Sequence, residues 1–173
     1  MHVHADVMIV GAGPAGLSAA LQAGRTGARV LLVDEQAELG GSLLGLKREI
    51  DGKSGPEWIE AARLELAAMP EVTVLTRSTA FGYYDQNYLC ILEQKTDHLP
   101  LAERAGRVRQ RVWHARVKKV ILATGAHERP LVFADNDRPG IMLAGAVQTY
   151  VNRYGVLPGK RMVLFTNNDS AYE

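Results

Sequence analysis

Three short apolar runs, at residues 6–10, 29–34 and 72–75, have the continuous hydrophobic character of buried parallel strands. Between the first two lies an Ala- and Leu-rich segment, residues 14–24, which predicts a helix closed by Gly27. Residues 56–69 place Ile59, Ala62 and Leu66 on one face, which predicts an amphipathic helix ending at Pro70. A strand–helix–strand unit of this length indicates a right-handed parallel crossover.

The pattern then changes to alternation with period two. Three stretches, "STAFGYYD", "NYLCILEQ" and "RQRVWHAR", predict antiparallel strands, and "KKVILATGA" returns to the parallel type. A helix is expected from near Pro139, followed by one more apolar strand in "RMVLFTNND". The predicted fold is α/β, a Rossmann-like parallel sheet with an inserted antiparallel β-meander of the two-dinucleotide flavoprotein type, truncated.

In terms of domains, residues 1–158 are expected to form a dinucleotide-binding domain with the meander at about 76–117. Residues 159–173 are expected to begin a second nucleotide-fold unit whose remainder is missing, so the chain is interpreted as a fragment.

Composition narrows the function classes. With 47% hydrophobic residues and a formal charge of +1, the chain is expected to bind neither nucleic acid nor a membrane. No signal peptide is expected at "MHVHADV", and a single cysteine excludes an internal disulfide. A cytoplasmic location is therefore predicted, with Cys90 as a buried structural thiol.

The main candidate site is the G-x-G-x-x-G motif of Gly11, Gly13 and Gly16, between a strand and a helix. The three glycines are expected to allow, in turn, a tight turn, close approach to a pyrophosphate, and close packing of helix on strand. The pyrophosphate would lie at the helix N-terminus beside Pro14 and Ala15.

Acidic residues end the second strand. Asp34, with Glu35 as a second candidate, is expected to accept hydrogen bonds from a ribose 2′-OH and to repel a 2′-phosphate. No arginine directly follows, which disfavours NADP. Thr124 and Gly125 in "VILATGA" are expected near the nucleotide at the carboxyl end of the sheet. The remaining candidate cofactor-binding residues are Gly41, Ser42 and Ala80.

Other chemistry-bearing residues favour structural roles. His127 is expected to be a loop histidine, the H-x-H of His2 and His4 lacks a third metal ligand, and Trp58 and Trp113 are expected in the core. The basic stretch Arg104–Lys119 is expected to form a solvated face, with an acidic neighbouring subunit as the alternative. No catalytic residues are predicted.

The runs "DVMIVGAGPAGLSAA…LLVDEQAELGGSLL" and "VILATGAHERPLVFADNDRPGIMLAGAVQTYVNRYGVLPGKRMVLFTNND" closely resemble the alpha subunit of heterotetrameric sarcosine oxidase. The second run is the more discriminating because it is much longer than a generic fingerprint. The strand at "VLFTNND" lacks a G-x-G, and ligand cysteines for an iron–sulfur cluster are missing.

The resemblance implies NAD in the G-x-G-x-x-G domain, FMN at a subunit interface, and FAD in the beta subunit. It also implies beta, gamma and delta subunits as partners, and a parent complex that demethylates sarcosine oxidatively and passes one-carbon units to tetrahydrofolate. Two alternatives stay open: an FAD-binding domain of a pyridine-nucleotide reductase-like flavoenzyme, and a structural adenine-nucleotide-binding module. The residues alone do not separate NAD from FAD, since both contain ADP.

Overall fold

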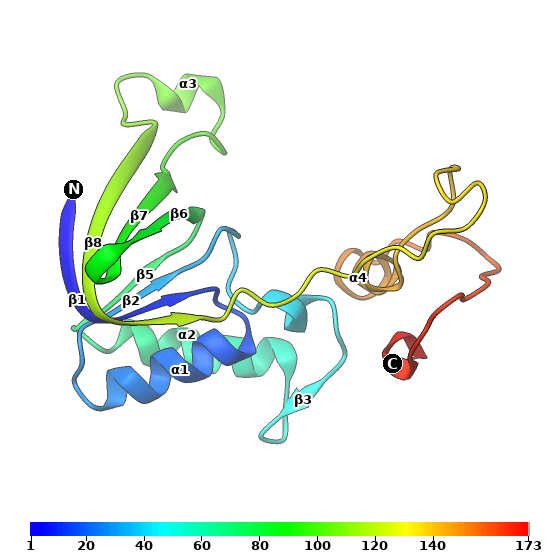
Figure 1. Ribbon diagram of the computed structural model, residues 1–173, viewed down its shortest axis with the longest axis horizontal. Coiled ribbons are helices and arrows are strands. Elements are labelled where there is room, and N and C mark those ends of the chain that lie inside the picture. The colour runs from blue at the N-terminus through cyan, green and yellow to red at the C-terminus, as the bar shows by residue number, and fades with distance from the viewer. Residues whose placement is uncertain (173) are drawn as a thin grey trace.

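A six-stranded sheet organises the chain in the computed structural model, which describes residues 1–172 (Figure 1). The strand order is β5-β2-β1-β8-β7-β6. Strand β1 pairs in parallel with β2 and β8, and β2 pairs in parallel with β5. Strand β7 pairs antiparallel with both β6 and β8. The strands span His2–Val10 (β1), Val30–Val33 (β2), Val72–Leu75 (β5), Ser78–Tyr84 (β6), Tyr88–Gln94 (β7) and Gln110–Leu122 (β8).

Two helices, α1 (Pro14–Arg25) and α2 (Gly55–Ala67), lie on the same face of the parallel strands (Figure 1). Their buried side chains, including Leu17, Ile59 and Leu66, pack with Ile9 and Leu32 of the sheet into one hydrophobic core. Both helices were predicted, and so were the strands they connect. The Rossmann-like fold class is thus confirmed.

Shorter elements complete the path of the chain. They are the 3-10 helices η1 (Gly41–Leu44), η2 (Asp85–Asn87) and η3 (Asp169–Tyr172), the hairpin strands β3 (Glu49–Ile50) and β4 (Lys53–Ser54), and the helices α3 (Leu101–Arg104) and α4 (Ala144–Tyr154).

Strand β8 differs from the prediction because one strand replaces two. Residues 110–116 pair antiparallel with β7, while residues 114–122 pair in parallel with β1. The change from alternating to continuous hydrophobicity therefore marks a change of neighbour within one strand, and the meander is an extension of the main sheet. At residues 114–116, β8 pairs with β1 on one edge and with β7 on the other, so the strand continues without interruption.

The meander strands form a second core on the other face of β1, β2 and β5. Leu89, Ile91 and Trp113 from β7 and β8 pack there with Met8 and Leu31. Trp58, in the first core, and Trp113 are both buried, as predicted, and so is Cys90.

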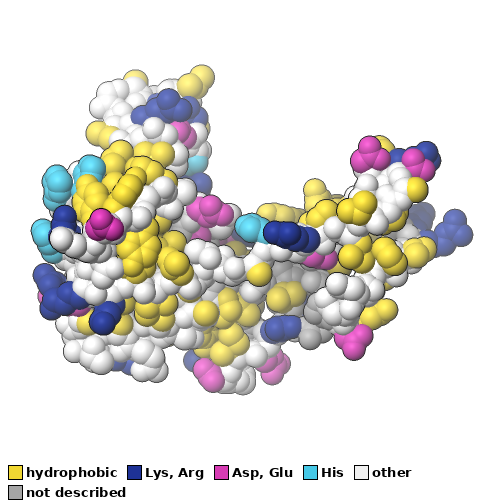
Figure 2. Space-filling view, in the orientation of Figure 1, with side chains coloured by type: hydrophobic (Ala, Val, Ile, Leu, Met, Phe, Trp, Pro, Cys, Tyr) yellow, Lys and Arg dark blue, Asp and Glu magenta, His cyan; other side chains and the backbone are white. Residues whose placement is uncertain are grey.

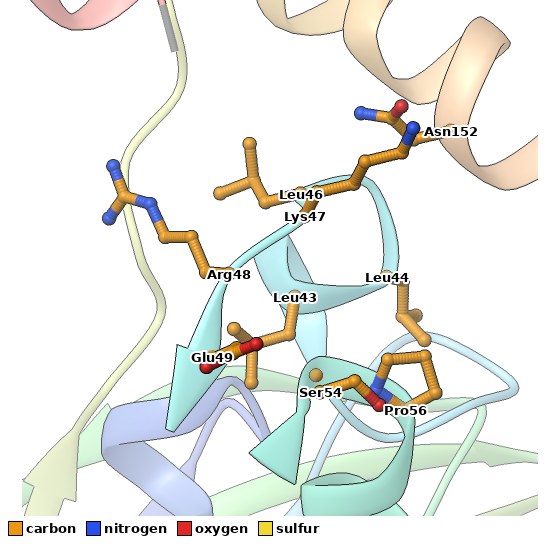
Figure 3. Close-up of a pocket in the computed structure, with 10 residues that line it drawn as sticks. Leu43, Leu44, Leu46, Lys47, Arg48, Glu49, Ser54, Pro56 and Asn152 are labelled. Atoms are coloured by element: carbon orange, nitrogen blue, oxygen red, sulfur yellow. The ribbon is translucent and has the colours of Figure 1, made fainter. Parts of the chain in front are cut away.

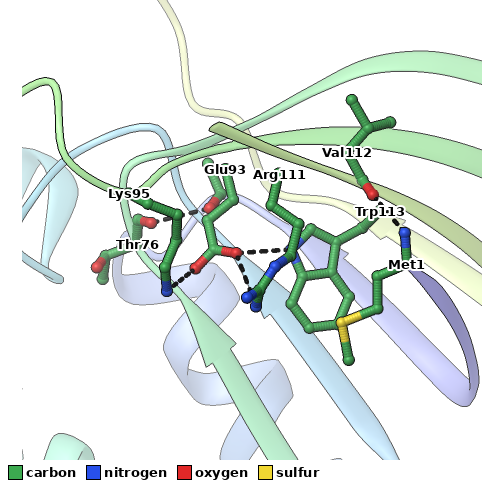
Figure 4. Close-up of polar contacts among 8 residues, drawn as sticks. Met1, Thr76, Glu93, Lys95, Arg111, Val112 and Trp113 are labelled. Atoms are coloured by element: carbon green, nitrogen blue, oxygen red, sulfur yellow. Dashed lines mark hydrogen bonds and ion pairs between the residues drawn. The ribbon is translucent and has the colours of Figure 1, made fainter. Parts of the chain in front are cut away.

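A buried carboxylate joins this second core to its rim (Figure 4). Glu93 accepts hydrogen bonds from Trp113 Nε1 at 2.8 Å and from Lys95 Nζ at 2.9 Å, and Arg111 lies at 3.7 Å. Burial raises the pKa of Glu93, but the hydrogen bonds from Lys95 and Trp113 outweigh it and lower that pKa below its ordinary value. The negative charge of Glu93 is therefore paired, which matters because an unpaired charge at a buried position would be destabilising.

The carboxyl-terminal segment departs from two predictions. Helix α4 begins at Ala144 and not near Pro139, because Gly140 has a φ of 94° and Ile141 N–H bonds to Arg138 in a turn. "RMVLFTNND" forms no strand in the part of the chain that the structure describes. No neighbouring strand supplies the hydrogen bonds that a strand needs.

This segment extends away from the sheet (Figure 1) and carries apolar side chains on its surface (Figure 2). Val132 and Val163 are more than nine-tenths exposed, and Phe133 meets Phe165 edge to face with ring centroids 5.7 Å apart. Few apolar side chains of this segment are covered by the rest of the chain.

Candidate dinucleotide-binding site

The glycine motif forms a tight, closely packed loop between β1 and α1. Gly11 has a φ of 100°, and a Cβ there would lie 2.2 Å from the carbonyl oxygen of Ala123. A Cβ on Gly16 would lie 1.8 Å from the carbonyl oxygen of Gly11. Glycine is required at both positions for the turn and for close packing, although Gly16 packs on the loop backbone and not on a strand.

Gly13 differs from the other two glycines. A Cβ there would find its nearest neighbour, the Cα of Gly41, at 4.0 Å, and the backbone has a φ of −71°. Packing within the chain therefore does not explain a glycine at this position. Because Gly13 has no side chain, a ligand can approach the first turn of α1 without obstruction from this residue.

The N-terminus of α1 has free hydrogen-bond donors. Gly13 is its N-cap, no side chain caps it, no acidic residue lies in its first turn, and Pro14 is in the first turn as predicted. Helix α2, in contrast, begins with a capping box in which the Ser54 side chain accepts from the N–H of Glu57 and the Glu57 carboxylate accepts from the N–H of Ser54. At α4, the carboxylate of Glu128 accepts from the N–H groups of Ala144 and Gly145 at 3.1 and 2.8 Å.

A helix N-terminus carries a partial positive charge and unsatisfied N–H groups. Side chains of this chain meet this need at α2 and α4, and no side chain does so at α1. The residues present therefore fit a pyrophosphate at α1.

Asp34 follows β2 and braces the glycine loop. One of its carboxylate oxygens accepts a hydrogen bond from the N–H of Ala12 at 2.5 Å, and the other accepts from the N–H of Gln36 at 2.7 Å. Glu35 is exposed, and its carboxylate accepts from the side-chain amide of Gln36 at 3.4 Å. The two neighbouring acids thus have different environments.

A second glycine pair, Gly40 and Gly41, closes over the first loop. The N–H of Gly40 donates to the carbonyl of Ala12 at 2.8 Å, and a Cβ on Gly41 would lie 2.8 Å from the Cα of Gly13. Gly41 has a φ of 52°, which glycine adopts without strain. Ser42 is exposed at the start of η1.

The carboxyl end of β8 completes the site. The N–H of Ala123 donates to the carbonyl of Val10 at 2.8 Å, which places this strand end beside the glycine loop. Thr124 is exposed, and its Cα would lie 3.1 Å from a Cβ on Gly11. Gly125 follows with a φ of 74°.

The structure thus brings Gly11, Gly13, Gly16, Asp34, Gly41 and Thr124 together at one edge of the sheet. Ala80 lies within β6, where it pairs with Ile91 and packs against the second core. His127 is exposed after β8. The sequence prediction missed Ala12 and Ala123, which act through backbone groups and so carry no residue-type signature.

Helix α4 packs against the loop that follows the second glycine pair (Figure 3). Asn152 Nδ2 donates to the carbonyl of Gly45 at 2.9 Å, and Arg153 pairs with Glu38 at 2.9 Å. A pocket of about 260 Å³ lies beside this contact, lined by residues that include Leu43, Lys47, Pro56 and Asn152. None of the predicted cofactor-binding residues lines this pocket.

The basic stretch is mostly paired within the chain, which agrees with a solvated face. Arg109 pairs with Asp97 at 2.7 Å, Lys118 pairs with Asp6 at 2.8 Å, and Arg116 stacks over the ring of Tyr88. Hydrogen bonds from Arg29 and then from Lys118 hold the pKa of Asp6 well below its ordinary value. Within residues 1–172, no helix has the length and apolar character needed to cross a bilayer.

A parallel sheet, a glycine loop and an uncapped helix N-terminus define a protein of the dinucleotide-fold class. The family model described as "Pyridine nucleotide-disulphide oxidoreductase" matches residues 5–157, and the chain belongs to that family of oxidoreductases.

Individual related proteins identify a narrower group than the family model does. The chain is 57% identical over 173 residues to "Sarcosine oxidase subunit alpha" of Corynebacterium sp. (strain P-1), and 51% identical over 170 residues to the protein of that name from Rhizobium meliloti (strain 1021). These matches cover 99% and 98% of the chain, and 18% and 17% of the relatives. The predicted resemblance to the sarcosine oxidase alpha subunit is thus confirmed, over less than a fifth of its length.

Among solved structures, L-proline dehydrogenase from P. horikoshii superposes with a TM-score of 0.71 at 26% identity. The match covers 92% of this chain and 30% of that one. It supports the flavoprotein type of the fold.

Proposed function

We propose that this chain is the dinucleotide-binding region of a sarcosine-oxidase-type alpha subunit and that it binds NAD. The observation that carries the proposal is the uncapped N-terminus of α1, preceded by a glycine loop that leaves no side chain over it. Gly11, Gly13, Gly16 and Gly41 would surround the pyrophosphate, with Pro14, Ala15 and Ser42 beside it. Thr124 and Gly125 would lie along the carboxyl edge of the sheet.

Within this site, Glu35 would receive the adenosine ribose. Both oxygens of Asp34 already accept backbone hydrogen bonds, whereas Glu35 is exposed one residue further on. A carboxylate at this place accepts hydrogen bonds from ribose hydroxyls. Asp34 would then act indirectly, by holding Ala12 and Gln36 in position, and Ala80 would contribute from the meander.

The dinucleotide would supply redox or structural function to a larger assembly. No residue of this chain is proposed as catalytic, and oxidative demethylation of sarcosine would take place in the parent complex with beta, gamma and delta subunits in the cytoplasm. FMN would lie at a subunit interface of that complex. This part of the proposal is supported by the identity to the sarcosine oxidase alpha subunits.

FAD is the alternative ligand, since its ADP half would fit the same loop and the fold type is shared with flavoproteins. The test is to purify the protein, record its absorbance, and identify by mass spectrometry the nucleotide released on denaturation. A colourless protein that releases NAD supports the proposal. A flavin spectrum with released FAD would replace NAD by FAD, and failure of the protein to bind ADP, NAD or FAD when these are added would refute the site.

A further inference from the structure

The turn between β5 and β6 lies directly beside the loop that carries Asp34 and Glu35. Asp34 N–H donates to the carbonyl of Leu75 at 2.9 Å, Ser78 N–H donates to the carbonyl of Asp34 at 2.8 Å, and Arg77 N–H donates to the carbonyl of Gln36 at 2.8 Å. The turn between β5 and β6 is therefore bonded to the residues on either side of Glu35. Arg77 and Glu35 occupy adjacent turns although Arg77 lies 42 positions further along the chain.

The backbone of Arg77 is held in an uncommon conformation. Its φ is 50°, its N–H is used by Gln36, and its carbonyl accepts from Gln94 N–H at 2.9 Å. A residue with a side chain is strained in such a region, which glycine would adopt without that strain. An arginine at this place thus carries a conformational cost that the backbone geometry alone does not require.

The side chain of Arg77 is half-buried, and within residues 1–172 its guanidinium forms no hydrogen bond or ion pair that would account for it. Other arginines of the meander have partners: Arg109 pairs with Asp97 and Arg116 bonds to Gln86. Glu35, likewise, forms no ion pair in this part of the chain. A cation and an anion that form no ion pair in residues 1–172 therefore belong to adjacent turns beside the proposed nucleotide site.

We propose that Arg77 is a specificity-determining residue at the adenosine end of this site, where it forms with Glu35 a pair that reads the ribose 2′-position. The inference rests on the proposed nucleotide site. Glu35 accepts from a free 2′-OH and repels a 2′-phosphate. Arg77 supplies the guanidinium that a 2′-phosphate would require, so the balance between the charges of Glu35 and Arg77 sets whether the ribose may carry that phosphate.

The position of Arg77 changes the expectation for a 2′-phosphate. No arginine directly follows Glu35 in the sequence, which disfavours a 2′-phosphorylated nucleotide. The fold delivers an arginine to the acid from another strand connection. Neutralising Glu35 should therefore convert the site to one that accepts the phosphate.

The test uses ADP and adenosine 2′,5′-bisphosphate as probes, because the ADP half is common to NAD and FAD. Binding is measured by calorimetry after any bound nucleotide has been removed, for the wild type, Glu35→Gln, Glu35→Gln with Arg77→Ala, and Glu35→Gln with Arg161→Ala. Arg161 is an exposed arginine of the carboxyl-terminal segment and is the matched control. Thermal unfolding checks that each variant is folded.

Glu35→Gln is expected to tighten binding of the bisphosphate by about tenfold or more relative to ADP. Adding Arg77→Ala should abolish that gain, and adding Arg161→Ala should leave it. Equal bisphosphate affinity in Glu35→Gln with and without Arg77 would overturn the role of Arg77. A wild type that binds neither probe nor dinucleotide would refute the nucleotide site itself, and that outcome is distinct because ADP binding is lost as well.

Discussion

Replacing the glycines of the loop one at a time should separate packing from ligand binding. In Gly16→Ala the new Cβ would lie 1.8 Å from the carbonyl oxygen of Gly11. Both groups belong to the backbone, so no rotamer change relieves the overlap, and α1 must move away from the loop. In Gly13→Ala the nearest atom is at 4.0 Å, an ordinary contact distance.

The magnitudes follow from these distances. Overpacking costs about 1–3 kcal/mol, and the 1.8 Å approach to a backbone atom places Gly16→Ala at the upper end of that range. Alanine in a helix returns about 0.5–1 kcal/mol relative to glycine, so we expect a net loss of about 2 kcal/mol. For a chain of this size that lowers Tm by about 4–8 °C. Alanine is a poorer N-cap than glycine, so Gly13→Ala should lose at most about 1 kcal/mol.

For ligand binding, in contrast to stability, Gly13→Ala should have the larger effect. The Cβ of Gly13→Ala would stand over the start of α1, where the pyrophosphate would approach, and should weaken binding of ADP at least about tenfold. Urea unfolding and calorimetry with ADP measure the two effects. The reasoning would be refuted by a Gly16→Ala variant as stable as wild type, or by a Gly13→Ala variant that binds ADP normally.

Three further variants test the contacts around the site. Ser54→Ala removes one half of the capping box of α2 and should cost about 1 kcal/mol in urea unfolding, whereas an unchanged midpoint would mean that the cap contributes nothing. Trp113→Phe takes a hydrogen bond from the buried carboxylate of Glu93 and should cost about 1–3 kcal/mol, measured in the same way; a smaller loss would show that Lys95 alone satisfies that group. Asp6→Asn should be less stable than wild type at neutral pH, because the lowered pKa of Asp6 means that its charged form is stabilised by folding; the difference should shrink as the pH falls below the ordinary value of about 3.9, and a difference independent of pH would contradict this.

The features of the fold and site that could be predicted from sequence are those encoded by residues close together in the chain. The glycine motif, Pro14 and the helices α1 and α2 follow from short-range patterns, and the structure contains them. Strand β8 was predicted as two strands because hydrophobic periodicity reports which faces are covered and not whether the backbone is continuous.

The divided roles of Asp34 and Glu35 could not be predicted either. Both are acidic and adjacent, and only the three-dimensional path of the glycine loop shows which carboxylate is taken by Ala12 N–H. Arg77 lies beyond any local pattern, since its neighbour Gln36 is reached through strand pairing. The expected strand at residues 161–169 failed for a related reason, because an apolar run becomes a strand only when another strand is alongside.

The single β8 strand has a consequence for errors in folding. Trp113 lies near one end of it in the second core, and Ala123 follows its other end against Gly11. Side chains alternate along a strand, so a slip of one residue against β1 would turn Trp113 out to solvent and would also carry Ala123 away from the glycine loop. A chain that pairs β8 in the wrong register thus loses its second core and its proposed nucleotide site together, and incorrectly folded molecules should be unable to retain a nucleotide.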